Sequence, residues 1–218
     1  MKNPGPKYRG RADAGKALAS ELKEYKNSNP VVLAIPNGGV PVALEVAREI
    51  KANLYLMIVR KLQIPGNPEA GFGAVTADGF LLLNHDLIER LGLSKKEIKT
   101  QGRKALESIR RRQSLFGKQA EIPALNDRTV VLIDDGLASG FTMEAAVSSV
   151  RDRGAGQIIV AVPTSSSTAY DRLVNLVDKI VCPNLSQERF FAVADAYHQW
   201  YDLGEDEVVK LLDPTSRD

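Results

Sequence analysis

The sequence lacks several features that would narrow its class at once. It has a single cysteine, Cys182, so no internal disulfide can form, and its aliphatic neighbours indicate a small buried side chain in a protein of a reducing compartment. Lysine and arginine number 29 against 27 aspartates and glutamates, which excludes both a polybasic tail that binds nucleic acid and an acidic disordered chain. No apolar run could span a membrane, and residues 1–6 contain no apolar signal segment. We therefore expect a cytoplasmic protein.

Histidine and aromatic residues are also scarce. His85 and His198 stand alone, without the clustered ligands of a zinc site and without a Ser-His-Asp arrangement, so both are expected to be structural. Aromatic residues make up 6% of the chain and gather near its C-terminus, where most should pack a small cap. The remaining composition, 44% hydrophobic and mainly aliphatic, is typical of a globular domain that needs no disulfide or metal for stability.

Short aliphatic runs separated by helical patterns organise the chain. The runs are apolar on both faces, which is typical of strands in a parallel sheet covered by helices on each side. They lie at residues 31–35, 54–59, 130–133, 158–162 and 179–182. Apolar residues at helical spacing predict helices over residues 42–50, 142–151 and 168–177. The expected fold is therefore α/β, with an open, twisted, mainly parallel sheet and helices on both faces.

Residues 63–78 interrupt this alternation. They are rich in glycine and proline and too irregular for a routine connection, so they are predicted to form a flexible functional loop. Asp78 and Gly79 then predict a tight turn between two short antiparallel strands.

Residues 85–118 are predicted to be a helical insertion. Ser94 and Glu97 have the spacing of a capping box, which predicts a long charged helix running to about residue 113. Its basic residues are Arg103, Lys104, Arg110, Arg111 and Arg112. They could meet nucleic acid or an anionic substrate, but the acidic residues among them and the near-neutral chain favour a solvated face or a subunit contact.

Residues 130–142 carry the clearest chemical signal. A buried strand ends in Asp134 and Asp135, and small residues and the start of a helix follow, so the polar groups should lie at the carboxyl edge of the sheet, where open α/β folds bind ligands. Small residues let backbone N–H groups approach a ligand, and a helix N-terminus attracts an anion, so this loop suits a phosphate monoester. The loop residues are Leu137, Ala138, Ser139, Gly140, Phe141 and Thr142.

The acidic pair predicts a different ligand group. Asp134 and Asp135 would repel a phosphate, but they could accept hydrogen bonds from two vicinal ribose hydroxyls whose 5-phosphate lies in the loop. They would also stabilise positive charge on that ribose, and Mg²⁺ is a further partner through water and substrate oxygens. An acidic pair after a strand also occurs in receiver-type phosphoacceptor domains and as helix caps. The phosphate-type loop that follows directly favours the ligand-binding role.

This pattern resembles the type I phosphoribosyltransferases, enzymes that use phosphoribosyl pyrophosphate (PRPP). The order of elements from residue 31 to residue 182 also resembles the core of that family. Segments 38–42, 60–62, 65–69, 134–137 and 190–193 resemble, more narrowly, a bacterial and archaeal group known only as predicted phosphoribosyltransferases. Gly136 and Phe141 depart from the family pattern, because many members have a β-branched residue and a second small residue there.

The resemblance implies roles for individual residues. Asp134 and Asp135 would hold the 2- and 3-hydroxyls of the ribose, and residues 137–142 would surround the 5-phosphate. A loop directly after the first strand would bind pyrophosphate through backbone amides. That loop comprises Pro36, Asn37, Gly38 and Gly39. Two glycines after a strand are also common in simple turns.

The resemblance also assigns positive charge and a lid. Arg60 and Lys61, expected at the end of the second strand, would contact pyrophosphate, although such residues commonly face solvent. Residues 63–77 would close over the site and exclude water. The narrower group tends to have arginine where this chain has Asn37, so charge on the pyrophosphate must come from Mg²⁺ or elsewhere.

In domain terms, residues 1–218 are predicted to form one domain with its core at about residues 28–183. Residues 184–218, with the N-terminal segment, would form the small hood that selects the acceptor in this family. Phe190 and Phe191 are the candidates for stacking on a planar acceptor.

The resemblance therefore implies an Mg²⁺-dependent phosphoribosyltransferase of nucleotide metabolism, with a base-like acceptor and a homodimeric assembly. One alternative is a regulator that senses PRPP or a nucleotide without transferase activity, with the basic residues 103–118 as its only candidate RNA-binding face. Another is an enzyme of the same fold that hydrolyses a phosphorylated sugar or nucleotide. The predicted lid and Lys61 favour the transferase, and Asn37 favours the regulator.

Overall fold

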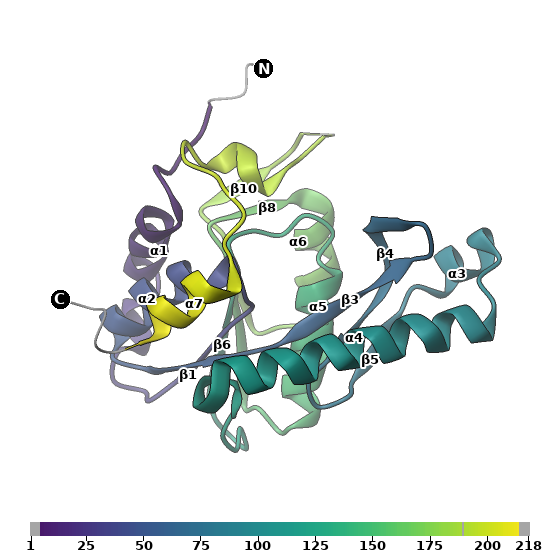
Figure 1. Cartoon of the computed structure of the whole chain (residues 1–218). Helices are drawn as coiled ribbons and strands as arrows, with labels where there is room; N and C mark the ends of the chain where they lie inside the picture. The colour runs from purple at the N-terminus through teal and green to yellow at the C-terminus, as the bar shows by residue number, and fades with distance from the viewer. Residues whose placement is uncertain (1–4, 189, 214–218) are drawn as a thin grey trace.

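A five-stranded parallel sheet lies at the centre of the computed structural model, which describes residues 5–188 and 190–213 (Figure 1). From one edge to the other its strands are β2 (Asn53–Leu56), β1 (Val31–Ala34), β6 (Thr129–Ile133), β7 (Gln157–Ala161) and β9 (Lys179–Val181). Every neighbouring pair is parallel, and β1, β6 and β7 consist largely of buried aliphatic residues. The structure confirms the predicted α/β fold with a mainly parallel sheet.

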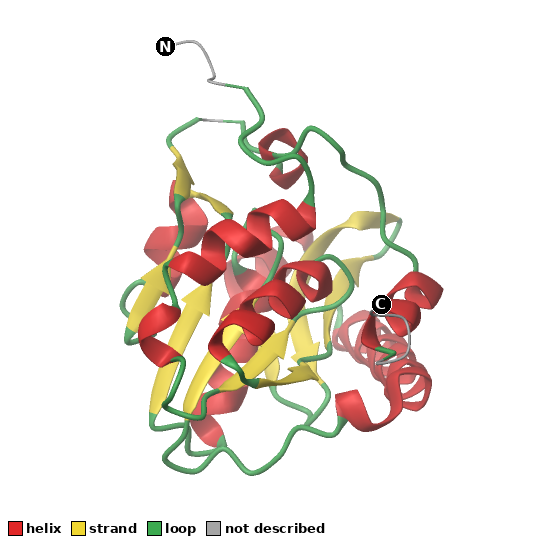
Figure 2. Cartoon of the chain, turned by 90° about the vertical axis from the view of Figure 1, so that its left-hand side faces the viewer, coloured by secondary structure: helices red, strands yellow, loops and turns green. Residues whose placement is uncertain are grey.

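Helices lie in front of this sheet and behind it (Figure 2). Successive strand residues point to opposite faces, so Val32 and Ala34 pack with one group of helices, and Val31 and Leu33 pack with another. The first group is α1 (Arg11–Ser20), α2 (Gly39–Ile50) and α7 (Glu205–Leu212), and the second is α5 (Phe141–Asp152) and α6 (Ser167–Leu173). Among the described residues, no helix has the length and apolar character needed to cross a membrane.

A second, antiparallel sheet follows the first two strands and corrects two predictions. Its strands are β3 (Val59–Ile64), β4 (Asn67–Thr76) and β5 (Leu81–Leu83). The single strand predicted at residues 54–59 is wrong, because β2 ends at Leu56 and β3 begins in the other sheet. Residues 63–78, predicted to be an irregular loop, form most of a β-hairpin, in which the pairing register shifts on both sides of Gln63. The turn predicted at Asp78 and Gly79 is present between β4 and β5.

Two helices connect this sheet to β6. They are α3 (His85–Leu91) and α4 (Lys95–Phe116), and α4 begins with the predicted capping box of Ser94 and Glu97. Figure 1 shows α4 extending along the antiparallel sheet. The buried side chains of α4, which include Ile109 and Phe116, all lie at or after Ala105, so the N-terminal part of the helix is less buried.

The two ends of the described chain meet beside the carboxyl edge of the parallel sheet. The Tyr8 N–H donates to the Ala196 carbonyl at 2.9 Å, and the His198 N–H donates to the Tyr8 carbonyl at 2.8 Å. A two-stranded sheet lies nearby, made of β8 (Thr164–Ser166) and β10 (Asn184–Ser186). Three short 3-10 helices complete the fold: η1 (Lys23–Tyr25), η2 (Gly117–Ala120) and η3 (Val193–Ala196).

Candidate active site

Asp134 and Asp135 follow β6 directly, at the carboxyl edge where the sequence predicted them. Burial raises the pKa of Asp134 well above its usual range, and the neighbouring Asp135 carboxylate raises it further. Burial also raises the pKa of Asp135, although the positive charge of Arg11 opposes that shift. One oxygen of Asp134 accepts a hydrogen bond from the Asp135 backbone N–H at 2.8 Å. The pair is therefore a site where a ligand that supplies hydroxyl donors or positive charge would be stabilised.

Arg11, at the start of α1, is the functional candidate that the sequence analysis missed. Its Nε donates to Asp135 Oδ2 at 2.8 Å, across 124 residues of sequence. Its Nη1 donates to the Tyr201 carbonyl at 2.9 Å, and its guanidinium carbon lies 4.1 Å from the centroid of the Trp200 ring. Neither a motif nor a periodic pattern marks Arg11, so no local signal in the sequence could have identified it.

Tyr197 holds the same part of the site from the C-terminal side. Its hydroxyl donates to the Asp135 backbone carbonyl at 2.5 Å. Burial raises the pKa of Tyr197 above its usual range, and the negative charge of Asp135 adds to that shift, so the phenol stays protonated and remains a donor.

The predicted pyrophosphate loop lies against the acidic pair. Parallel register pairs Ala34 with Ile133, so the loop after β1 and the acids after β6 reach the same sheet edge. A side chain at Gly38 would overlap the Asp135 carboxylate, and a Cβ at Gly39 would lie 2.8 Å from the Ile133 carbonyl oxygen. The two glycines are therefore required by close packing against the acids, in addition to any ligand that they bind.

Asn37 joins this loop to the C-terminal segment. Its Nδ2 donates to the Leu203 carbonyl at 2.7 Å. Its Oδ1 is buried and has no hydrogen-bond partner among the described residues. An unsatisfied buried acceptor is costly, so this oxygen is a candidate to accept from a ligand or from a ligand's water.

The predicted phosphate loop has the backbone of an anion site. Gly140 precedes α5 with φ +78°, and no side-chain hydrogen bond caps that helix, so its first N–H groups remain open. The loop is anchored from below, because the Ser166 hydroxyl donates to the Ala138 carbonyl at 2.7 Å. A cation not predicted from the sequence borders it: Arg172 Nε donates to the Ser139 carbonyl at 3.0 Å, and its guanidinium stacks on Phe141 at 4.0 Å.

Arg60 and Lys61 lie elsewhere than predicted. Both belong to β3 of the antiparallel sheet, since β2 ends four residues before Arg60. Burial lowers the pKa of Arg112, and the charge of nearby Arg60 lowers it further, so Arg60 lies beside α4. Lys61 is exposed and packs across Gly71 of β4. A contact of either residue with pyrophosphate stays a prediction.

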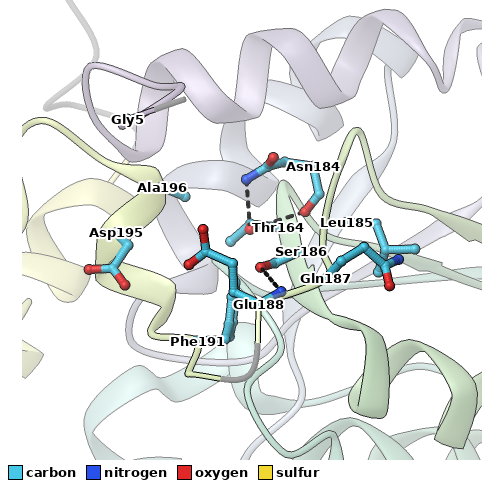
Figure 3. Close-up of a pocket in the computed structure, with 10 residues that line it drawn as sticks. All are labelled: Gly5, Thr164, Asn184, Leu185, Ser186, Gln187, Glu188, Phe191, Asp195 and Ala196. Atoms are coloured by element: carbon cyan, nitrogen blue, oxygen red, sulfur yellow. Dashed lines mark hydrogen bonds between the residues drawn. The ribbon is translucent and has the colours of Figure 1, made fainter. Parts of the chain in front are cut away.

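A small cavity is lined mainly by residues of the C-terminal segment, with Thr164 of β8 on one wall (Figure 3). Its volume is about 170 Å³, and its lining includes Phe191, Glu188, Thr164 and Asn184. The Asn184 side-chain amide donates to the Thr164 hydroxyl at 3.0 Å, and that hydroxyl donates to the Asn184 backbone carbonyl at 3.1 Å. Phe190 is 84% exposed and is not among the lining residues. Of the two phenylalanines predicted to stack on an acceptor, Phe191 therefore lines the cavity and Phe190 does not.

Comparison with known proteins identifies the family of the chain. The family model of the phosphoribosyl transferase domain matches residues 8–199. The chain belongs to the phosphoribosyl transferase family. Two provisionally named phosphoribosyl transferases of Mycobacterium tuberculosis are 38% identical to it over 208 residues, which is 95% of this chain and 47% of theirs. The chain thus spans about half the length of those relatives.

Two solved structures share the fold of this chain. A crystal structure of a Thermus thermophilus protein, 34% identical, matches with a TM-score of 0.78 and covers 94% of this chain and 97% of its own. A protein of Aquifex aeolicus, 11% identical, has a TM-score of 0.51 and covers 80% of this chain and 74% of its own, which shows a shared fold alone.

The structure explains why this chain has glycine at one position where it departs from the pattern of its family. Gly136 follows the acidic pair, where many members have a β-branched residue. A Cβ at Gly136 would lie 2.5 Å from the Val193 side chain and 2.9 Å from the Thr164 side chain. Val193, from η3 of the hood segment, therefore fills the volume that a larger residue would need.

Proposed function

We propose that this phosphoribosyl transferase moves ribose 5-phosphate from PRPP to a small base-like acceptor and releases pyrophosphate. The observation that carries the proposal is the position of Asp134 and Asp135, between the open N-terminus of α5 and the glycine loop at the start of α2. PRPP has a matching order of groups. Its 5-phosphate would meet the anion site at α5, its ribose would meet the two acids, and its pyrophosphate would meet the second amide-lined loop.

The charges fit the reaction. As the bond from ribose C1 to the pyrophosphate oxygen breaks, positive charge develops on the sugar and negative charge on the leaving group. Asp134 and Asp135 would hold the ribose hydroxyls and stabilise the positive sugar. The open N–H groups of α5 would hold the 5-phosphate, and residues 36–39 would face the pyrophosphate. The acceptor nitrogen then bonds to C1 as the C1–O bond breaks, and its proton passes to the released pyrophosphate or to water. No protein side chain needs to form a covalent bond.

The donor set fits a magnesium ion. Mg²⁺ prefers oxygen ligands and commonly keeps several waters, and Asp134, Asp135 and the unsatisfied Oδ1 of Asn37 are oxygen donors around one loop. Among the described residues, no three His, Cys, Asp or Glu side chains form a closed metal cage. The ion would therefore be held indirectly, through water and substrate oxygens, and when bound it would neutralise the pyrophosphate.

The cavity beside η3 is the proposed acceptor site. Thr164, on its wall, also packs against Gly136, the residue after the acidic pair, so an acceptor in the cavity would lie close to the ribose. Phe191 would stack on a planar ring, whereas Phe190 would not. A homodimeric cytoplasmic enzyme of nucleotide metabolism, with residues 63–77 as its lid, belongs to the same proposal.

One observation favours a second function, a regulator that binds PRPP or a nucleotide without transferring the ribose. Asn37 stands where related sequences tend to have arginine, and its amide is engaged by Leu203 instead of a ligand. Weak charge at the pyrophosphate loop would slow departure of the leaving group more than it would weaken ribose binding.

Calorimetric titration with PRPP, with and without Mg²⁺, followed by a pyrophosphate-release assay against a panel of bases, separates these functions. Binding with base-dependent release is the expected result. Binding without release for any base would favour the regulator. A lack of binding would overturn the assignments of Asp134, Asp135 and residues 137–142.

A further inference from the structure

Arg11 is a buried cation beside the acidic pair, at a point where the proposed reaction itself requires no protein cation. Its side chain is 7% exposed. Burying a guanidinium is costly unless charges and hydrogen bonds satisfy it, and Arg11 is satisfied by groups of the site itself: Asp135, the Tyr201 carbonyl and the Trp200 ring. These partners hold the Arg11 guanidinium in a fixed position beside the Asp135 carboxylate.

Different hydrogen-bond donors engage the two carboxyl groups of the acidic pair. Arg11 engages Oδ2 of Asp135, and a backbone N–H engages Oδ1 of Asp134. Each carboxylate is thus held at one oxygen by a donor from the described residues. The Asp134 and Asp135 side chains also hydrogen-bond each other, so Arg11 and the backbone N–H hold a coupled pair of carboxyls whose oxygens face the proposed ribose site together.

Arg11 also joins the two ends of the chain over the site. On one side it belongs to α1, and on the other it contacts Trp200 and Tyr201. The same C-terminal segment holds the Asp135 carbonyl through Tyr197 and the pyrophosphate loop through the Leu203 carbonyl. A rotation of the Asp135 carboxylate would therefore break its hydrogen bond with Arg11, the residue that links α1 to the C-terminal segment.

We infer that Arg11 is a positioning residue of the ribose site, which fixes the orientation in which the Asp135 carboxylate, and with it the acidic pair, meets the substrate. This inference rests on the proposed function. Lysine could supply the charge, but it has no planar fork to reach Asp135 and the Tyr201 carbonyl together and to stack on Trp200. The geometry of the guanidinium, and not its charge alone, is what the site uses.

Four variants, one of them Asp135→Asn alone, and one control test the inference. Arg11→Gln removes charge and geometry, Arg11→Lys keeps the charge, and Arg11→Gln combined with Asp135→Asn tests whether the two residues act together. Arg9→Gln is the matched control, because Arg9 is an exposed arginine of the same segment. Trp200 is the only tryptophan of the chain, so its fluorescence reports directly on the Arg11 contact, and thermal melting monitors folding.

The expected result is a loss of PRPP affinity of about 10- to 100-fold for Arg11→Gln, since a buried hydrogen bond between charged groups is removed. Arg11→Lys should recover only part of that loss, and Arg9→Gln should bind as the unmodified chain does. If Arg11 acts through Asp135, the double variant should bind no more weakly than Asp135→Asn alone.

Unchanged affinity of a folded Arg11→Gln, or full additivity in the double variant, would overturn the role of Arg11 and leave the proposed function standing. If Arg11→Gln does not fold, Arg11→Lys decides, and affinity equal to that of the unmodified chain would count against the role of geometry. A failure of the unmodified chain to bind PRPP would overturn the proposed function and the inference together.

Discussion

The two parts of the candidate site are assembled in opposite ways. Residues 130–142 carry the acidic pair, the phosphate loop and the start of α5 in one continuous segment. The groups that hold this segment in place come from Arg11 and residues 197–203, from opposite ends of the chain. The groups proposed to touch the ligand are therefore close together in sequence, whereas their orientation depends on contacts between residues far apart in the chain.

A change within the local segment should have the largest effect. Gly140→Val introduces a β-branched residue at φ +78° and blocks backbone approach at the start of α5. We expect PRPP affinity to fall by more than about 100-fold, because the open N–H groups of the helix are lost to the phosphate. Calorimetry measures the affinity. Gly102→Val, in α4 with open space around the added Cβ, is the control, and retained affinity in Gly140→Val would move the phosphate elsewhere.

Substitution of the acidic pair tests whether residues 130–142 bind the ligand or only stabilise the fold. Asp134→Asn with Asp135→Asn should lower PRPP affinity by about 100-fold, since two hydrogen bonds to charged acceptors are weakened. The folded state should persist, because burial already raises the pKa of both carboxyls and their charge is costly in the unliganded protein. Parallel thermal melts check this point, and an unchanged binding isotherm would contradict the ribose assignment.

The packing of Gly136 against Val193 can be tested by enlarging one side chain and shortening the other. Gly136→Val should destabilise the fold by about 1–3 kcal/mol, because its side chain would overlap Val193. Adding Val193→Ala should restore much of that stability by making room for the new side chain. Urea denaturation of the single and double variants measures both effects. Simple addition of the two losses would show that Gly136 and Val193 do not compete for one space.

The dependence of stability on pH should show the smallest effect. The pKa of Asp134 is raised in the folded state above its ordinary value of 3.8, so the folded state binds its proton more tightly than the unfolded state does. The free energy of unfolding should then fall as the pH rises from about 4 toward the folded pKa, by about 1.4 kcal/mol for each pH unit between the unfolded and folded pKa values. Asp134→Asn should show a smaller decline, because Asp135, whose pKa is also raised, still titrates. Denaturation of both proteins across that range provides the measurement, and parallel curves would contradict the raised pKa.

Much of the fold could be predicted because its signals are periodic and local. Buried parallel strands produce continuous apolar runs, and the capping box of Ser94 and Glu97 was recognisable from its spacing. The prediction was wrong at residues 54–59, since an apolar run does not reveal where a chain leaves one sheet for another. It was also wrong about an irregular loop at residues 63–78, because the glycine and proline content of an irregular hairpin resembles that of a loop.

The sequence by itself determined the parallel sheet, the place of Asp134 and Asp135 at its carboxyl edge, and the small residues that open α5 to an anion. These features follow from neighbouring residues and from the alternation of a strand. Only the tertiary structure decided that Arg11 holds Asp135, that Tyr197 and Leu203 tie the C-terminal segment to the site, and that Phe191 rather than Phe190 lines the cavity. Those contacts join residues far apart in the chain, and their partners are specified by packing and charge in three dimensions, which no spacing in the sequence records.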